Sequence, residues 1–309
     1  MGPPPPLATR HADRAERGRA RRRHRQCVGR HHGREPGHAR RLRAGRCRGA
    51  GHARHVLPPA SAFHRVTVFT LDLPVPQRAL AVAAHPDDVE FGCGGTFAKW
   101  AATGCAIHHL ICTDGSKGTW DADVDKDELV GTRQAEQREA SRVLGGTGDV
   151  VFLGHNDGEL DAGLAERREV ASWIRRLQPD VVLGHDPWRR YRLHPDHRNA
   201  GFLLTEGIVA ARDPQFFPDL GLAPHRPKTL LLWEADEPDH VEDVGAHLQT
   251  KVAALLAHRS QYRSTMHIDD PADNHQVERF RRRVAATAAD HGRPAGVAYG
   301  ERFKAIRDL

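Results

Sequence analysis

From residue 78 onward, short apolar runs alternate with amphipathic stretches, and this alternation limits the fold more than any other feature of the chain. The runs that predict strands are 78–84, 106–113, 150–153, 181–183 and 229–233. The stretches that predict helices are 96–103, 126–144, 164–177, 196–212 and 241–258. Strands separated by helices of this length indicate a Rossmann-like α/β fold, with a mostly parallel sheet covered by helices on both faces. In such a fold the active site is expected at the carboxyl ends of the strands.

Two of the predicted strand ends carry clusters of possible metal ligands. His85-Pro86-Asp87-Asp88 follows the first strand, and His194-Pro195-Asp196-His197 follows the strand at 181–183 after a loop. His85 and Asp88 are three residues apart, so one turn brings both side chains to the same side, and His197 can supply a third ligand. Two histidines and one aspartate with an open fourth position are typical of catalytic zinc. Fe²⁺ can occupy the same ligands in the cell.

The residues beside these ligands suggest catalytic roles. Asp87 is placed to accept a proton from zinc-bound water, whose pKa the metal lowers to roughly 7. His194 could donate a hydrogen bond to the oxyanion formed when that water attacks an amide, and Asp196 could orient the His194 ring. The alternative is that paired aspartates cap a helix and that the histidines are surface residues, since the chain contains 22 histidines. From the residues alone, both interpretations stay open.

The charge of the chain is unevenly distributed and divides it into two parts. Residues 1–65 carry 17 arginines, no lysine and only three acidic residues, whereas residues 66–309 carry 37 acidic and 29 basic residues. The first part has too few aliphatic residues to form a core and is expected to be a disordered extension, either non-functional or a basic arm for nucleic acid. The second part is expected to form the enzyme domain. Because its net charge is negative, we expect no nucleic-acid partner.

Cellular location is constrained only by what the sequence lacks. The five cysteines form no CxxC pair and no disulfide-like pattern, and no apolar run is long enough to span a bilayer. We therefore expect a cytoplasmic protein that does not enter a membrane. Homo-oligomers are compatible with the sequence.

Several segments, taken in order, resemble the PIG-L family, also called the LmbE-like family of zinc-dependent N-acetylglucosaminyl deacetylases. The segment HPDDVEFGCGG (85–95) resembles the family signature and HPDH (194–197) its second motif. RQAEQREASRVLG (133–145) and FLGHNDGEL (152–160) are similar to the family's intervening segments, and 251–261 and 299–303 to its closing helices. One common family variant has glutamate directly after the paired aspartates, whereas here Val89 intervenes before Glu90. The resemblance covers residues 78–309.

The resemblance implies roles for individual residues. It implies that His85, Asp88 and His197 bind zinc. Asp87 would then be the general base, and His194 would stabilise the oxyanion. It also places Arg133 near the site, although Arg133 could equally be a helix-surface charge paired with Glu136 or Gln137. Asp157 matches a family acid, but a turn at Asp157-Gly158 is the preferred interpretation.

The expected function is removal of the N-acetyl group from a small N-acetylglucosamine-type conjugate. Alternatives are an amidase acting on a thiol–sugar conjugate of the mycothiol type, a non-haem iron oxygenase, a metal-binding module without catalysis, and a nucleic-acid binder acting through the basic tail. Segments 115–125, 186–193 and 213–227 are the expected specificity loops. Trp188, Tyr191 and the three arginines between residues 189 and 192 would suit an anionic or polyhydroxyl aglycone.

Overall fold

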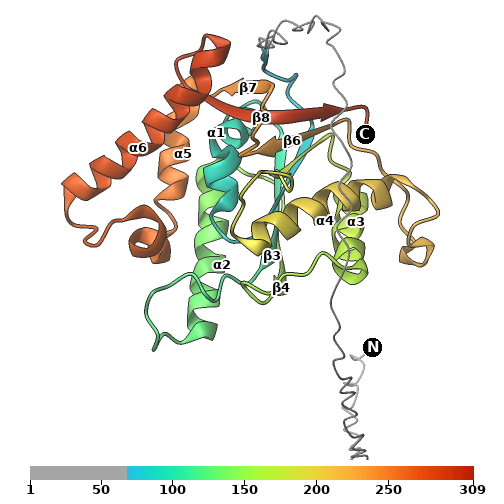
Figure 1. Cartoon of the computed structure of the whole chain (residues 1–309), viewed down its shortest axis with the longest axis horizontal. Coiled ribbons are helices and arrows are strands. Elements are labelled where there is room, and N and C mark those ends of the chain that lie inside the picture. The colour runs from blue at the N-terminus through green and yellow to red at the C-terminus, as the bar shows by residue number, and fades with distance from the viewer. Residues whose placement is uncertain (1–67) are drawn as a thin grey trace, which may run out of the picture. The chain divides into compact units, whose positions relative to one another are not determined.

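The computed structural model describes residues 68–309, and the prediction for residues 1–65 lies outside them. An eight-stranded sheet runs through this part, in the order β1-β7-β8-β6-β5-β2-β3-β4 (Figure 1). Its strands are β1 Thr70–Leu71, β2 Arg78–Ala83, β3 Ala106–Thr113, β4 Val150–His155, β5 Val181–His185, β6 Thr229–Trp233, β7 His240–Asp243 and β8 Gly300–Arg307. The helices are α1 Asp88–Ala102, α2 Lys126–Val143, α3 Leu164–Leu177, α4 Pro195–Arg212, α5 Leu248–Leu255 and α6 Asn274–Gly292.

The sheet is parallel except where β8 pairs with β6 and β7, which confirms the predicted fold class. From β2 the chain continues outward to β3 and β4, then returns to place β5 on the other side of β2. This reversal makes the carboxyl ends of β2 and β5 a topological switch point, where ligands of such sheets bind.

Alternating residues of β2 enter two separate cores because successive side chains of a strand point to opposite faces. Ala79, Ala81 and Ala83 pack with α1, α2 and α5, whereas Leu80 and Val82 pack with α3 and α4. Figure 1 shows the two groups of helices on either side of the sheet. Helix α6 lies outside the first group, and its apolar stripe packs against α5 in a third cluster.

The C-terminal third departs most from the sequence prediction. The helix expected over 241–258 is wrong: its first part is strand β7, a 3₁₀ turn follows at Gly245–His247, and only Leu248–Leu255 is α-helical. The segment 299–303, expected in a closing helix, lies largely in β8. In both cases pairing between β7 and β8 overrides local sequence preference. Strand β1 and helix α6 were not predicted.

Helix α1 begins eight residues earlier than the sequence predicted, at Asp88 rather than at residue 96. Its first turns lie close against the sheet: a Cβ atom on Gly92 would lie 2.5 Å from the Trp233 side chain. Gly92 therefore permits close packing. Asp88 is the first helical residue, and the backbone of α1 departs from helical geometry at Cys93. Among residues 68–309, no helix is long and apolar enough to cross a membrane.

Candidate active site

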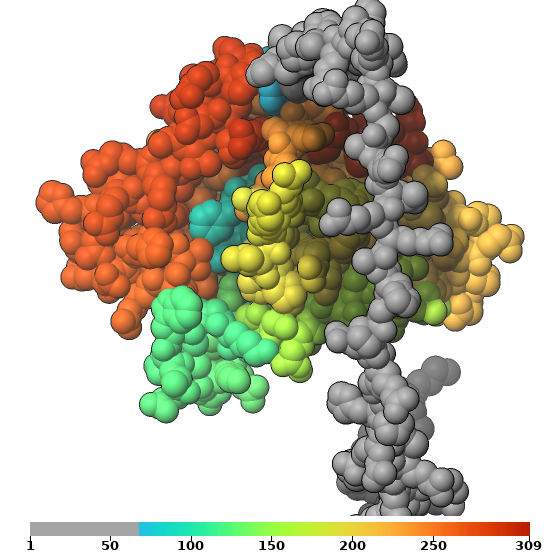
Figure 2. Space-filling model, viewed as in Figure 1, coloured from blue at the N-terminus to red at the C-terminus, as the bar shows by residue number. Residues whose placement is uncertain are grey.

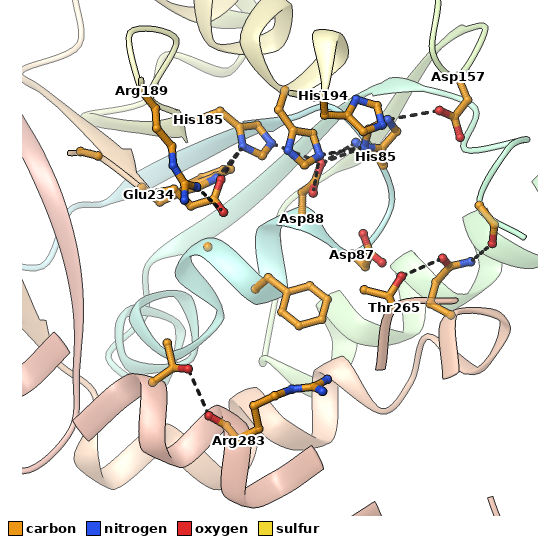
Figure 3. Close-up of a pocket in the computed structure, with 18 of the residues that line it drawn as sticks. His85, Asp87, Asp88, Asp157, His185, Arg189, His194, Glu234, Thr265 and Arg283 are labelled. Atoms are coloured by element: carbon orange, nitrogen blue, oxygen red, sulfur yellow. Dashed lines mark hydrogen bonds and ion pairs between the residues drawn. The ribbon is translucent and has the colours of Figure 1, made fainter. Parts of the chain in front are cut away.

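The two predicted clusters meet at the switch point of the sheet. His85 lies just beyond β2, Asp88 opens α1, and His197 lies in the first turn of α4, where Pro195 begins the helix after His194. Proline is well suited to the first position of a helix, so the turn that presents His197 is built into the motif. Figure 3 shows the rings of His85 and His194 and the Asp88 carboxylate gathered at one end of a pocket.

The ligand atoms of the predicted triad are mutually adjacent. His85 Nδ1 lies 3.3 Å from Asp88 Oδ2 and 3.2 Å from His197 Nε2, and His197 Nε2 lies 3.3 Å from Asp88 Oδ1. Ligands about 2.0–2.1 Å from a tetrahedral zinc ion are about 3.3–3.4 Å from one another. The donor set and its spacing therefore fit zinc.

The second nitrogen of the His85 ring contacts two carboxylates. This Nε2 atom lies 3.2 Å from Asp196 and 3.3 Å from Asp157. Although burial opposes the charged ring, hydrogen bonds to Asp157, Asp196 and Asp88 raise the pKa of His85 well above its usual value. A carboxylate on the second nitrogen of a metal-binding histidine fixes the ring and increases its basicity. Asp157 does more than form a turn.

The predicted role of Asp196 needs correction. Its carboxylate contacts His85 and accepts hydrogen bonds from the backbone N–H groups of Gly158 and Leu160, and no hydrogen bond joins it to His194. The His194 ring instead lies edge-on to His85 and stacks on His197, with centroid distances of 4.6 and 4.7 Å. Asp196 is fully buried, and the turn that follows β4 and the His85 ring occupy its two carboxylate oxygens.

Asp87 and Asp88 are neighbours in very different environments. Burial raises the pKa of Asp87 to about 6, against the opposing charge of Arg133. Asp88 is also buried, yet His197 and His185 hold the pKa of its carboxyl well below the usual range. Asp87 is thus the carboxylate that exchanges a proton more readily, whereas Asp88 remains ionised beside the imidazoles.

The peptide unit between Pro86 and Asp87 is clamped from both sides. Arg133 Nη2 donates to the Pro86 carbonyl at 2.6 Å, and the Asp87 amide donates to Gln137 Oε1 at 3.0 Å. Asp87 has a φ of 107°, a costly conformation for a residue other than glycine. The clamp therefore stabilises a backbone geometry that directs the Asp87 side chain into the pocket.

The alternative of a surface charge at Arg133 is wrong, since its exposed fraction is 3%. The guanidinium also donates to the Gly115 carbonyl at 2.8 Å and lies 3.7 Å from the Asp87 carboxylate. A Cβ atom on Gly115 or Gly118 would lie within 2.7 Å of it. Glycines in this loop make room for the guanidinium.

His185, the last residue of β5, was missed by the sequence analysis. Its Nδ1 accepts a hydrogen bond from the Trp233 indole at 2.9 Å, and its Nε2 lies 3.2 Å from Asp88 Oδ2. Because an indole N–H only donates, the proton of neutral His185 is assigned to Nε2 and points at Asp88. His185 thus orients Asp88. The triad of Asp88, His185 and His197 is also compact, but that proton makes it a poorer metal site than the predicted triad. The position of His185 at the end of a strand was the sequence signal that could have identified it.

A pocket of about 1070 Å³ opens in front of this cluster. Its surface is hollowed between the blue-green α1, the yellow segment that carries His194 and His197, and the orange-to-red C-terminal part (Figure 2). Pockets for drug-sized ligands range from about 300 to 1,000 Å³, so there is room for an amino sugar and a further group.

Comparison with known proteins gives the family. The model of the family PIG-L, GlcNAc-PI de-N-acetylase, matches residues 80–208. Diacetylchitobiose deacetylase of Thermococcus kodakarensis is 35% identical over 189 residues, which cover 60% of this chain and 70% of that protein. The chain belongs to the PIG-L family.

Two further PIG-L relatives extend the match. The 1D-myo-inositol 2-acetamido-2-deoxy-alpha-D-glucopyranoside deacetylase of Actinosynnema mirum is 30% identical over 237 residues, covering 62% of this chain and 83% of that protein. The structure of N,N'-diacetylchitobiose deacetylase from Pyrococcus horikoshii, complexed with its inhibitor MPG, superposes with a TM-score of 0.67 at 30% identity. The superposition covers 75% of this chain and 84% of the Pyrococcus horikoshii chain.

The region matched by the PIG-L model contains all three predicted metal ligands but only part of the pocket. Residues Gln261, Thr265, His267, Arg283, Thr287, His291 and Arg302 also line the pocket and lie beyond residue 208. Of the expected specificity loops, 115–125 and 186–193 contribute Lys117, Gly118 and Arg189, whereas no residue of 213–227 lines the pocket. Trp188 and Tyr191 are exposed elsewhere.

Proposed function

We propose that this PIG-L protein is a zinc-dependent N-deacetylase that hydrolyses the acetamide of an N-acetylglucosamine conjugate. The observation that carries the proposal is the close approach of three side chains beside the separate carboxylate of Asp87. The ring nitrogens of His85 and His197 lie 3.2 Å apart, and each lies 3.3 Å from one oxygen of Asp88. The relatives support the substrate class, since those reported above are named as deacetylases of acetylated amino sugars.

The chemistry is divided among the residues of the cluster. His85, Asp88 and His197 would hold the metal, which polarises the amide carbonyl and acidifies water. Asp87 accepts the proton of the attacking water and then passes it to the nitrogen of the departing amine. His194, exposed at the pocket, donates a hydrogen bond to the oxyanion of the tetrahedral intermediate. Zinc is the proposed metal, with Fe²⁺ as the alternative.

The test uses the full chain loaded with one metal at a time. N-acetylglucosamine, N,N'-diacetylchitobiose and the inositol-linked glucosaminide are incubated with it, and released acetate and free amine are both quantified. We expect equal amounts of acetate and amine, with zinc or Fe²⁺ required. A protein that binds the metal stoichiometrically yet releases neither product from any N-acetylglucosaminide would contradict the proposal.

A further inference from the structure

The pocket has a second wall, opposite the metal-ligand cluster, formed by segments far along the chain. Arg283, Thr287 and His291 follow one another at four-residue spacing on α6 and therefore share one face of that helix. Arg302 of β8 lines the same pocket and is close enough to contribute to the lowered pKa of His291, which burial chiefly causes. We call these four residues the α6–β8 wall. In Figure 3 the labelled Arg283 lies across the pocket from the histidine cluster.

The cations of the pocket differ in whether a carboxylate neutralises them. Lys117 pairs with Glu159 at 2.9 Å, Arg133 lies 3.7 Å from Asp87, and Arg189 lies 3.1 Å from Glu234.

By contrast, neither arginine of the α6–β8 wall has a carboxylate within 4.0 Å among residues 68–309. Arg283 donates only to the Met266 carbonyl, at 3.1 Å, and stacks over the Phe280 ring at 5.4 Å. Both guanidiniums are exposed to the pocket, so their remaining N–H groups can reach a bound molecule.

The composition of this wall matches one class of ligand. Two guanidiniums and an imidazole can donate to phosphate or carboxylate oxygens, and guanidinium binds such groups in bidentate fashion. The Thr287 hydroxyl donates to the Arg283 carbonyl at 3.1 Å, so it lines the wall without offering a free donor. The arginine-rich loop at 189–192 is less suited to binding an anionic group, because Glu234 pairs with both Arg189 and Arg192.

We propose that the α6–β8 wall binds an anionic group, a carboxylate or a phosphate, on the aglycone of the amino-sugar substrate. This inference rests on the proposed function, because the acetamide must occupy the metal end of the pocket for the aglycone to extend toward α6.

The test compares matched substrates and matched variants. Alkyl N-acetylglucosaminides of three chain lengths, in both anomers, end in a hydroxyl, a carboxylate or a phosphate, and kcat/KM is measured for each. We expect an anionic end to raise kcat/KM by about tenfold or more over the hydroxyl, since hydrogen bonds to charged groups are the stronger kind. The two anionic series separate a carboxylate from a phosphate ligand. The preference should weaken with added salt because the wall is exposed.

Arg283→Gln and Arg302→Gln should each reduce this preference by about tenfold. Arg282→Gln, the exposed neighbour on α6 that does not line the pocket, is the control and should retain it. Equal kcat/KM for charged and uncharged ends, or equal loss for both in the variants, would overturn the inference. If no compound is deacetylated, the proposed function fails instead. In that case, calorimetry of the phosphate-ended compound with the wild type and with Arg283→Gln tests anion binding by the α6–β8 wall separately. Weaker binding to the variant would support the wall, and equal binding would overturn it.

Discussion

The two walls of the pocket are built on opposite principles. At the metal end, groups are largely buried and interlocked: His85 contacts three carboxylates, His185 contacts Asp88, and Arg133 holds the loop before α1. On the α6–β8 wall the charged groups are exposed and have no carboxylate partner among the described residues. Interlocked groups keep a fixed geometry for one reaction, whereas unpaired exposed groups are available to a variable part of a substrate. We therefore expect variants at the metal end to affect every substrate, and variants at the far wall to affect only some.

The largest effect should follow the loss of a metal-ligand nitrogen. His85→Ala or His197→Ala removes one of the three proposed ligands, so bound zinc should fall to near zero and activity by on the order of 10³-fold or more. His194→Ala is the matched control: it should keep its zinc, while kcat falls by about 10²–10³-fold through loss of the oxyanion donor. Elemental analysis alongside kinetics measures both. Zinc loss from His194→Ala would instead favour the triad of His85, His194 and His197.

The clamp on the Pro86–Asp87 peptide should matter next. Gln137→Leu removes the acceptor of the Asp87 amide, so Asp87 should leave its position at φ 107° and kcat should fall by about 10- to 100-fold. KM and zinc content should change little. Gln134→Leu, on the same helix and without such a contact, is the control. Equal kcat for the two variants would show that the clamp does not position Asp87.

A smaller effect is expected from the hydrogen bonds behind Asp88. His185→Phe removes the imidazole N–H that donates to Asp88. Zinc affinity should therefore weaken by about 10- to 100-fold, as it does when other hydrogen-bond partners of metal ligands are lost. Trp233→Phe removes only the indole that selects the His185 tautomer, so its effect should be weaker. Competition with a chelator of known affinity measures both. Loss of zinc affinity in Trp233→Phe that exceeds the loss in His185→Phe would contradict this order.

How far the sequence could predict these features depends on how local they are. His85, Asp88 and His197 follow from short motifs at strand ends, and their proximity follows from the parallel sheet. The roles of Gln137, Asp196 and His185 could not be read in the same way, because each depends on which side chain a distant element presents. The α6–β8 wall is the extreme case: β8 returns antiparallel to the sheet, so Arg302 meets α6 only through the tertiary fold. The apolar spacing of Phe280, Val284 and Ala288 did carry a signal for α6 itself.

The central claim is that two adjacent aspartates have different roles, and one measurement separates them. Zinc content and kcat are determined together for Asp87→Asn and Asp88→Asn. Because Asp87 lies outside the ligand set, Asp87→Asn should keep near-normal zinc while kcat falls by about 10²–10⁴-fold, the usual contribution of a general base. Asp88→Asn should lose zinc and regain part of its activity when zinc is added. Zinc loss from Asp87→Asn with Asp88→Asn still loaded would reverse the assignment, and equal loss from both would mean that the base lies elsewhere.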